Sequence, residues 1–157
     1  MKILLAVIVF KTVTAFLIGS QPDKSCRHGW LPWRRTCFML SIGVENWSNA
    51  ELRCRALGGY LAEIYDAETN SFLKTHLKAL HFSNHTVSYW IGLTDVAKLN
   101  TWEWVHGRSL PNFTDWHPTQ PVDNDEHCAL LLGITAFNWH DQKCDAIINF
   151  ICQEDIY

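Results

Sequence analysis

The stretch Val87-Ser88-Tyr89-Trp90-Ile91-Gly92-Leu93 divides this sequence into two parts with different patterns. Its β-branched and aromatic side chains predict a β-strand. Before this stretch, apolar residues recur at helical spacing, whereas after it short apolar runs alternate with turn-forming residues. Two helices followed by short strands predict an α+β fold.

Two helices are expected upstream of the strand. Ser48-Asn49-Ala50-Glu51 has the form of a capping box, in which the serine hydroxyl accepts from a backbone amide and the glutamate reaches back. It predicts a helix over 48–57 that Gly58-Gly59 ends. Asp66 is the expected N-cap of a second helix, one face of which carries Phe72, Leu73, His76, Leu77 and Leu80.

The downstream part consists of short strands and one long loop. Trp102 and Trp104 alternate on one face of an expected strand at 101–105. Further strand-like runs lie at 128–132, 137–139 and 149–152. The segment 106–127 holds Gly, Pro, Asn, Asp and Thr with few aliphatic residues. Such a long irregular loop in a compact domain is usually functional or disordered.

Composition bounds the class of protein. The chain has 157 residues, 48% of them hydrophobic and 18% charged, which fits one globular domain and excludes a disordered or collagenous chain. The net charge is −3, with no cluster of Lys and Arg. This balance argues against nucleic acid or an anionic membrane as partner.

The first twenty residues have the form of a signal peptide. Lys2 precedes the apolar run 3–10, which is too short to span a bilayer at about 20 residues. Cleavage is expected after Ala15 or Ser20, which leaves a single domain over 21–157. The sequence therefore predicts a secreted, extracellular protein without membrane insertion.

Secretion decides how the six cysteines are interpreted. An even number of Cys in an oxidising compartment indicates a disulfide framework, although six cysteines allow fifteen pairings. A free catalytic Cys is disfavoured by the even count. Asn46, Asn84 and Asn112 each begin an Asn-x-Ser/Thr sequon and are predicted glycosylation sites.

Taken together, these motifs resemble those of the C-type lectin-like domain. The resemblance covers Cys26 to Gln153 and rests on the order and spacing of several short motifs. They are Cys26 and Cys37, Trp47, Cys54, Gly58-Gly59-Tyr60-Leu61-Ala62, Trp90-Ile91-Gly92-Leu93, Trp102 and Trp104, Cys128, Trp139-His140-Asp141, Cys144 and Phe150-Ile151-Cys152. Within that family the chain is similar to the perlucin-like secreted lectins of molluscs.

The resemblance implies a specific framework. It implies the disulfides Cys26–Cys37, Cys54–Cys152 and Cys128–Cys144. It also implies that 90–93 is the central core strand and that 106–127 is the binding loop. Trp90, Trp102, Trp104 and Trp139 are expected in the core.

The resemblance also implies a calcium-dependent sugar site. In the family, oxygen donors come from a Glu/Gln-Pro-Asn/Asp segment, a Glu two residues before the loop cysteine, and an Asn-Asp pair after a Trp. Here these places hold Gln120-Pro121-Val122, Glu126 and His140-Asp141. Gln120, Glu126 and Asp141 keep their oxygen donors. The proline at this place is commonly cis in the family.

Two positions depart from the family pattern. Val122 has no side-chain oxygen and His140 replaces an amide. Among the neighbouring residues 123–125, Asp123 would take the third position if the backbone shifts by one residue. The expected metal set is Gln120, Asp123, Glu126, His140 and Asp141, and the expected sugar contacts are Gln120, Trp116, Glu126, His140 and Asp141. Gln at the first position accompanies galactose-type sugars, and Trp116 is the candidate for stacking on a sugar.

Other functions are weighed against a calcium-dependent lectin. His127, His140, Glu126 and Asp141 would suit zinc, but calcium is the expected ion. A lectin-like domain that binds proteins, matrix or mineral instead of glycans and glycoproteins is the alternative, favoured by the acidic loop. No GxSxG, HExxH or phosphate-binding glycine loop occurs, so an enzyme is not expected.

Overall fold

The computed structural model describes residues 25–107, 109, 111–122 and 125–157. The predicted signal peptide and Asp123 lie outside these residues. The elements, in chain order, are β1 (Leu31–Trp33), β2 (Thr36–Leu40), α1 (Trp47–Ala56), β3 (Tyr60–Leu61), α2 (Ala67–Leu80), β4 (Ser88–Thr94), β5 (Glu103–Trp104), β6 (Cys128–Leu132), the 3-10 turn η1 (Gly133–Thr135), β7 (Asn138–Gln142) and β8 (Asn149–Asp155). The expected α+β fold is confirmed.

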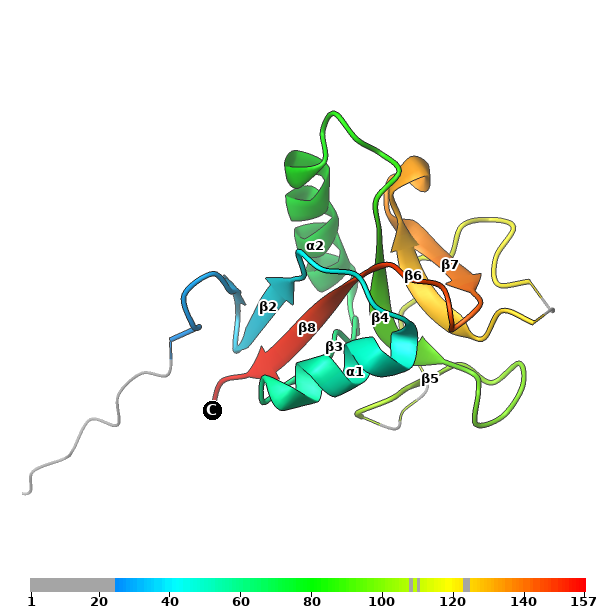
Figure 1. The fold of residues 1–157 in the computed structure, drawn as a ribbon, viewed down its shortest axis with the longest axis horizontal. Coiled ribbons are helices and arrows are strands. Elements are labelled where there is room, and N and C mark those ends of the chain that lie inside the picture. Colours follow the sequence, from blue (N-terminus) through cyan, green and yellow to red (C-terminus); the bar gives the residue numbers. More distant parts are fainter. Residues whose placement is uncertain (1–24, 108, 110, 123–124) are drawn as a thin grey trace, which may run out of the picture.

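The strands form one sheet in the order β1-β2-β8-β4-β6-β7, with β3 on β8 and β5 on β4. Strands β4 and β8 are parallel, and the other pairs are antiparallel. In Figure 1, β8 runs diagonally between the two helices, and β6 and β7 lie toward the opposite end from the C-terminus. Among the described residues, no helix has the length and apolar character to cross a membrane.

Strand β4 is the central core strand, as expected. All seven of its residues are buried. A side chain at Gly92 would place its Cβ 2.7 Å from the Leu61 carbonyl oxygen, because the backbone after β3 passes directly over this strand. The Gly92 N–H donates to the Ala62 carbonyl at 2.8 Å across the same contact. The glycine therefore permits two backbones to approach closely.

Alternate residues of β4 serve two core clusters. Ile91 and Leu93 join the cluster beneath α2, and Trp90 joins the cluster beneath α1. Trp90, Trp104 and Trp139 are fully buried, as expected for core residues. Trp102 is only partly buried and packs at the margin of the first cluster.

The start of α1 differs from the prediction. Asn46 is the N-cap and accepts the Asn49 N–H at 2.9 Å, so the capping box at Ser48 is wrong. Glu51 instead accepts the backbone N–H of Leu61 at 2.8 Å. The helix begins earlier because the Trp47 indole is buried and donates to a carbonyl of β4 at 2.9 Å.

Other local predictions are confirmed. Asp66 caps α2 by accepting the Thr69 N–H at 2.7 Å. Gly58 adopts a φ of 83° immediately after α1, a conformation that glycine allows at little cost.

The three disulfides have the pairing that the resemblance implies. They are Cys26–Cys37, Cys54–Cys152 and Cys128–Cys144. The second bridge links α1 to β8 across 98 positions of sequence. The third joins β6 to the segment after β7, so the end of the long loop is tied to the strand that carries Trp139-His140-Asp141.

Candidate functional site

The candidate site lies where the long loop runs beside β7. We call residues 115–122, 126 and 139–141 the rim. The loop pairs with β7 through a parallel bridge between Trp116 and Trp139. The Trp139 N–H donates to the Asp115 carbonyl, and the His117 N–H donates to the Trp139 carbonyl, each at 2.9 Å. The loop therefore continues the sheet at this edge.

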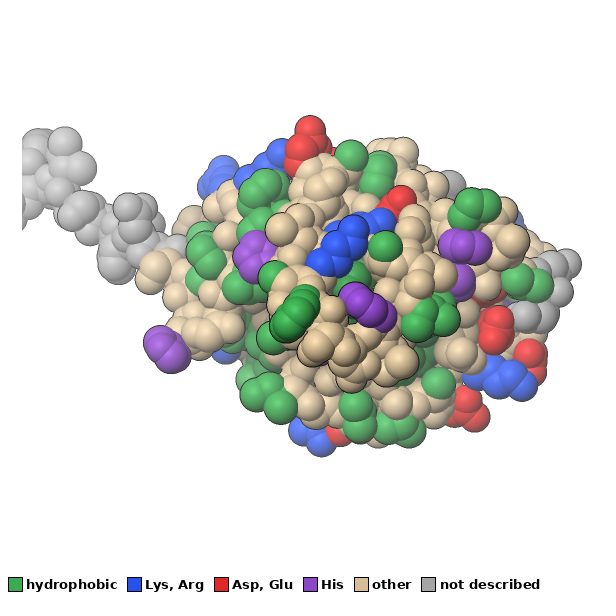
Figure 2. Space-filling view, turned by 90° about the horizontal axis from the view of Figure 1, so that it is seen from above, with side chains coloured by type: hydrophobic (Ala, Val, Ile, Leu, Met, Phe, Trp, Pro, Cys, Tyr) green, Lys and Arg blue, Asp and Glu red, His purple; other side chains and the backbone are tan. Residues whose placement is uncertain are grey.

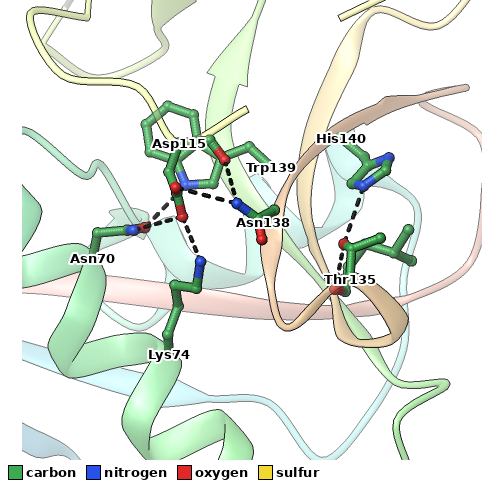
Figure 3. Close-up of polar contacts among 8 residues, drawn as sticks. Asn70, Lys74, Asp115, Thr135, Asn138, Trp139 and His140 are labelled. Carbon is green, nitrogen blue, oxygen red and sulfur yellow. Dashed lines mark hydrogen bonds and ion pairs between the residues drawn. The ribbon is translucent and has the colours of Figure 1, made fainter. Parts of the chain in front are cut away.

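Asp115 joins the loop to both α2 and β7. Its Oδ2 accepts from Lys74 Nζ at 2.5 Å and from Asn70 Nδ2 at 2.8 Å, and its Oδ1 accepts from Asn138 Nδ2 at 3.2 Å. Figure 3 shows Asn70 and Lys74 reaching from the helix to this carboxylate. The buried Trp139 indole donates to Asn70 Oδ1 at 3.0 Å, which connects the same asparagine to the core.

The segment after this anchor brings Gln120 and Val122 to the end of β7. The Gln120 N–H donates to the His117 carbonyl at 2.8 Å. The Gln120–Pro121 peptide bond is cis, as the resemblance implies. The Val122 N–H then donates to Asp141 Oδ2 at 2.7 Å. Val122 therefore contributes through its backbone, although its side chain has no donor atom for a metal.

Two buried oxygens of the rim lack a hydrogen-bond partner among the described residues. They are Gln120 Oε1 and Asp141 Oδ1. Asp141 is only 4% exposed. Burial raises the pKa of its carboxyl, the Val122 N–H opposes this rise, and the Glu126 carboxylate adds to it. Buried unpaired oxygens are costly, and a bound cation is one way to satisfy them.

The remaining acids of the loop differ in their surroundings. Glu126 is partly buried and close enough to Asp141 to affect its pKa. Asp125 is exposed and forms an ion pair with Lys143 at 2.6 Å, which lowers the pKa of the aspartate. The cationic partner of Asp125 therefore comes from the segment after β7.

His140 packs against a second histidine. Its ring stacks on that of His117 with centroids 5.0 Å apart, and its Nε2 lies 3.1 Å from Thr135 Oγ1. Burial, followed by the neighbouring His117, lowers the pKa of His140, so the ring is neutral at neutral pH.

The residues considered for zinc are not gathered around one point. His127 Nδ1 lies 3.0 Å from the buried Asp95 carboxylate, whereas His140 Nε2 lies 3.1 Å from Thr135 Oγ1. Within the described ranges, no group of three or more His, Cys, Asp or Glu side chains is arranged to hold a metal ion. This finding applies both to the zinc alternative and to the calcium ligands Glu126 and Asp141, so neither is present as a preformed metal centre among the described residues.

Trp116 is packed within an aromatic cluster. Its ring lies edge-on to Trp102 at 4.9 Å and to Trp139 at 5.8 Å, and it remains partly exposed. These contacts give it a structural role. Its predicted stacking on a sugar stays a prediction.

The sequons differ in accessibility. Asn84 and Asn112 are exposed. Asn46 is partly buried, and its side-chain oxygen caps α1.

Sequence reasoning missed the residues that anchor the loop. Asn70, Lys74 and Asp115 were not expected to be functional, since the helix partners lie 45 and 41 positions from the aspartate. Asn70 lies on the buried side of α2 with Leu73 and Leu77 and is only 5% exposed. A polar residue on such an apolar face is the signal that could have indicated a buried partner.

Residues 44–154 match the model of the Lectin C-type domain. A "Perlucin-like protein" of Mytilus galloprovincialis is 30% identical over 94% of this chain and 98% of its own length. A "C-type lectin mannose-binding isoform" of Notechis scutatus scutatus is 32% identical, and a "C-type lectin galactose-binding isoform" of Pseudechis porphyriacus is 31% identical, each over 90% of both chains.

Solved structures show the same fold. The carbohydrate-recognition domain of the mouse scavenger receptor C-type lectin has a TM-score of 0.74 and 29% identity, over 85% of this chain and all of that one. A calcium-independent type II antifreeze protein has a TM-score of 0.73 and 25% identity, over 85% of this chain and 96% of its own. Proteins of this fold therefore include both a carbohydrate-recognition domain and a calcium-independent protein.

Proposed function

Because the chain belongs to the C-type lectin domain family, whose members bind ligands and are not enzymes, we propose that it is a calcium-dependent carbohydrate-binding protein whose sugar site is the rim. Gln120, Glu126 and Asp141 hold the ion in this proposal. The observation that carries it is the pair of buried, unpartnered oxygens on Gln120 and Asp141.

The chemistry of these donors fits calcium. Ca²⁺ takes six to eight oxygen ligands, including carboxylate and amide oxygens. Gln120 Oε1 and Asp141 Oδ1 are free to serve, and Glu126 lies close enough to affect the pKa of Asp141. Asp141 Oδ2 is already held by the Val122 N–H, which orients the carboxylate before any ion arrives. When bound, the ion would supply open coordination positions for sugar hydroxyls.

The departures from the family pattern set the expected affinity. Val122 contributes no oxygen, and His140 Nε2 is engaged with Thr135. Asp123 is the further ligand that we propose from the sequence. With fewer protein donors than the family usually has, we expect calcium affinity in the millimolar range that is found for extracellular modules.

Galactose-type sugars are the proposed ligands. Gln120 is the residue that carries this choice, since the resemblance associates Gln at this place with galactose. The mannose-binding and galactose-binding relatives are 32% and 31% identical to the chain, so overall similarity does not discriminate between the two sugars. Trp116, His140 and the three rim donors are the proposed sugar contacts.

We also propose that the protein is secreted and glycosylated. The signal-like segment 1–20 supports secretion. Asn84 and Asn112 are the favoured acceptors because both are exposed, whereas Asn46 is partly buried at the start of α1.

Calcium titration of the purified protein tests the ion. At a calcium concentration ten times the dissociation constant, mass action stabilises the folded state by about 1.4 kcal/mol, or about 5 °C in Tm. The protein should remain on galactose resin in calcium and elute with chelator. Asp141→Asn should lose both effects, because the unpaired carboxylate oxygen becomes part of a neutral amide.

Asp145→Asn is the matched control, since it removes one exposed acid from the segment after β7. This control should behave as the unmodified protein does. If calcium raised Tm equally in the two variants, the assignment of the site would be wrong. Absence of both calcium stabilisation and resin binding in the unmodified protein would leave the second candidate function.

The second candidate is binding to a protein, matrix or mineral surface without calcium. The lack of a side-chain oxygen at Val122 favours it, as does the likeness to a calcium-independent antifreeze protein. Binding to such surfaces that persists in chelator and in Asp141→Asn would support it.

A further inference from the structure

A groove with basic side chains runs along α2, apart from the rim donors. It consists of two neighbouring cavities of about 370 Å³ each, which share Lys78. One lies between α2 and the loop, and the other lies between the end of α2 and the turn η1. We call this the α2 groove, and its main polar and aromatic residues are Ser71, Lys74, Thr75, Lys78, Phe113 and His85.

The lining of the groove holds two lysines and one aspartate, in a chain whose net charge is −3. Lys74 and Lys78 line the cavity beside the loop together with Asp115, and Lys78 and His85 line the cavity beside η1. The Asp115 carboxylate is already paired with Lys74 at 2.5 Å. Lys78, which is exposed in the last turn of α2, is therefore the lysine of the groove that can pair with an anion of a ligand.

Figure 2 looks down on this end of the molecule. A lysine or arginine side chain and a histidine side chain lie near the centre of the face with an acidic side chain beside them, and further basic and acidic side chains lie toward its edges.

The other lining groups indicate the chemistry of the ligand. Ser71 and Thr75 present hydroxyl groups one helical turn apart on the wall of the groove. Hydroxyls donate and accept hydrogen bonds, which suits a polyhydroxylated ligand. Phe113 adds an apolar surface at one end, and Phe82, 79% exposed, adds another at the far end. Lysine binds sulfate or carboxylate groups as a flexible point charge.

We propose that the α2 groove binds an anionic polysaccharide, recognised through its sulfate or carboxylate groups, without calcium. The ligand lies along α2, with its anionic groups at Lys78 and His85 and its hydroxyls at Ser71 and Thr75. This site is additional to the proposed calcium-dependent sugar site, because Gln120, Glu126 and Asp141 do not line either cavity.

Binding to immobilised chondroitin sulfate in the presence of chelator tests the groove. The experiment uses the secreted protein with its own glycans in place, since the proposed acceptors Asn84 and Asn112 lie next to lining residues His85 and Phe113. We expect saturable binding that weakens with salt and is absent on neutral dextran. Hyaluronan, which carries carboxylates but no sulfate, identifies which anionic group is recognised.

Lys78→Gln should weaken this binding about fivefold, as expected for one solvent-exposed charge contact. Lys78→Arg should retain it. Lys98→Gln is the matched control, because it removes one exposed lysine from the turn after β4 with the same change in net charge.

Equal binding by Lys78→Gln and Lys98→Gln would overturn the proposal, and so would equal retention on dextran. Galactose-resin retention in calcium should be unchanged in Lys78→Gln. Failure of the α2 groove is therefore distinguishable from failure of the calcium site, which Asp141→Asn reports.

Discussion

Replacement of Asp115 by alanine should destabilise the protein strongly, although the residue lies in a loop. The variant loses contacts to Lys74, Asn70 and Asn138, while the backbone bond from the Trp139 N–H is retained. Hydrogen bonds to a charged group contribute about 1.5–3 kcal/mol each and are not additive. The Lys74 side chain is only 16% exposed, so it would be left largely buried without its anion.

We therefore expect a loss of about 3 kcal/mol, which corresponds to about 10 °C in Tm for a domain of this size. Thermal unfolding followed by circular dichroism measures it. Asp115→Asn should lose less, because an amide oxygen still accepts one hydrogen bond. Asp145→Ala removes an exposed acid and should change stability by no more than about 0.5 kcal/mol. Equal Tm values for Asp115→Ala and Asp145→Ala would refute the role of Asp115 as the anchor of the loop.

Two further predictions concern α2 and β4. Burial alone would raise the pKa of Asp66, but hydrogen bonds from Thr69 and the charge of Arg34 lower it below the usual value. The aspartate thus stabilises the fold above its unfolded pKa of about 3.9, and this contribution is lost as pH falls through the lower folded pKa. Asp66→Asn should therefore be less stable than the unmodified protein near neutral pH, and the gap in urea midpoint should close as pH falls through the lowered folded pKa. A gap of constant size would contradict this. Gly92→Ala should lower the free energy of unfolding by about 1–3 kcal/mol, because its Cβ would lie 2.7 Å from the Leu61 carbonyl oxygen. Gly43→Ala is the control, since its Cβ would enter open space and should have little effect. Similar Tm values for the two variants would argue against a close backbone approach at β4.

Local chemistry explains which elements could be predicted from the sequence. Asp66 as an N-cap and Gly58 after α1 depend on residues within one helical turn, and both are confirmed. The cap at Ser48 failed because burial of Trp47, a tertiary contact with β4, sets where that helix begins. Local capping patterns compete with such contacts, which are not visible in the sequence nearby.

Strand lengths show the same limit. Strand β8 extends to Asp155, beyond the predicted end at 152, because it pairs with β2 through Thr36. In contrast, β5 is shorter than the predicted run 101–105, since only Glu103 and Trp104 pair with β4. Pairing partners, rather than the apolar pattern alone, determine where these strands end.

The candidate site was only partly accessible to sequence reasoning. The resemblance identified Gln120 and Asp141, and the structure brings their segments together through the Val122 N–H. Val122 was counted solely as a missing oxygen donor, because a side-chain pattern does not reveal what a backbone group does. The anchor at Asp115 was missed because its helix partners are distant in sequence.

The pairing of β2 with β8 has a practical consequence. Thr36 lies opposite Asp155, so the start of the described domain and its C-terminus share one end of the molecule, and Figure 1 shows β7 and the long loop at the other. If the protein is attached to a sensor surface through a tag after Tyr157, the long loop faces the solution. Immobilisation through that terminus should thus leave the rim accessible to the proposed sugar ligands.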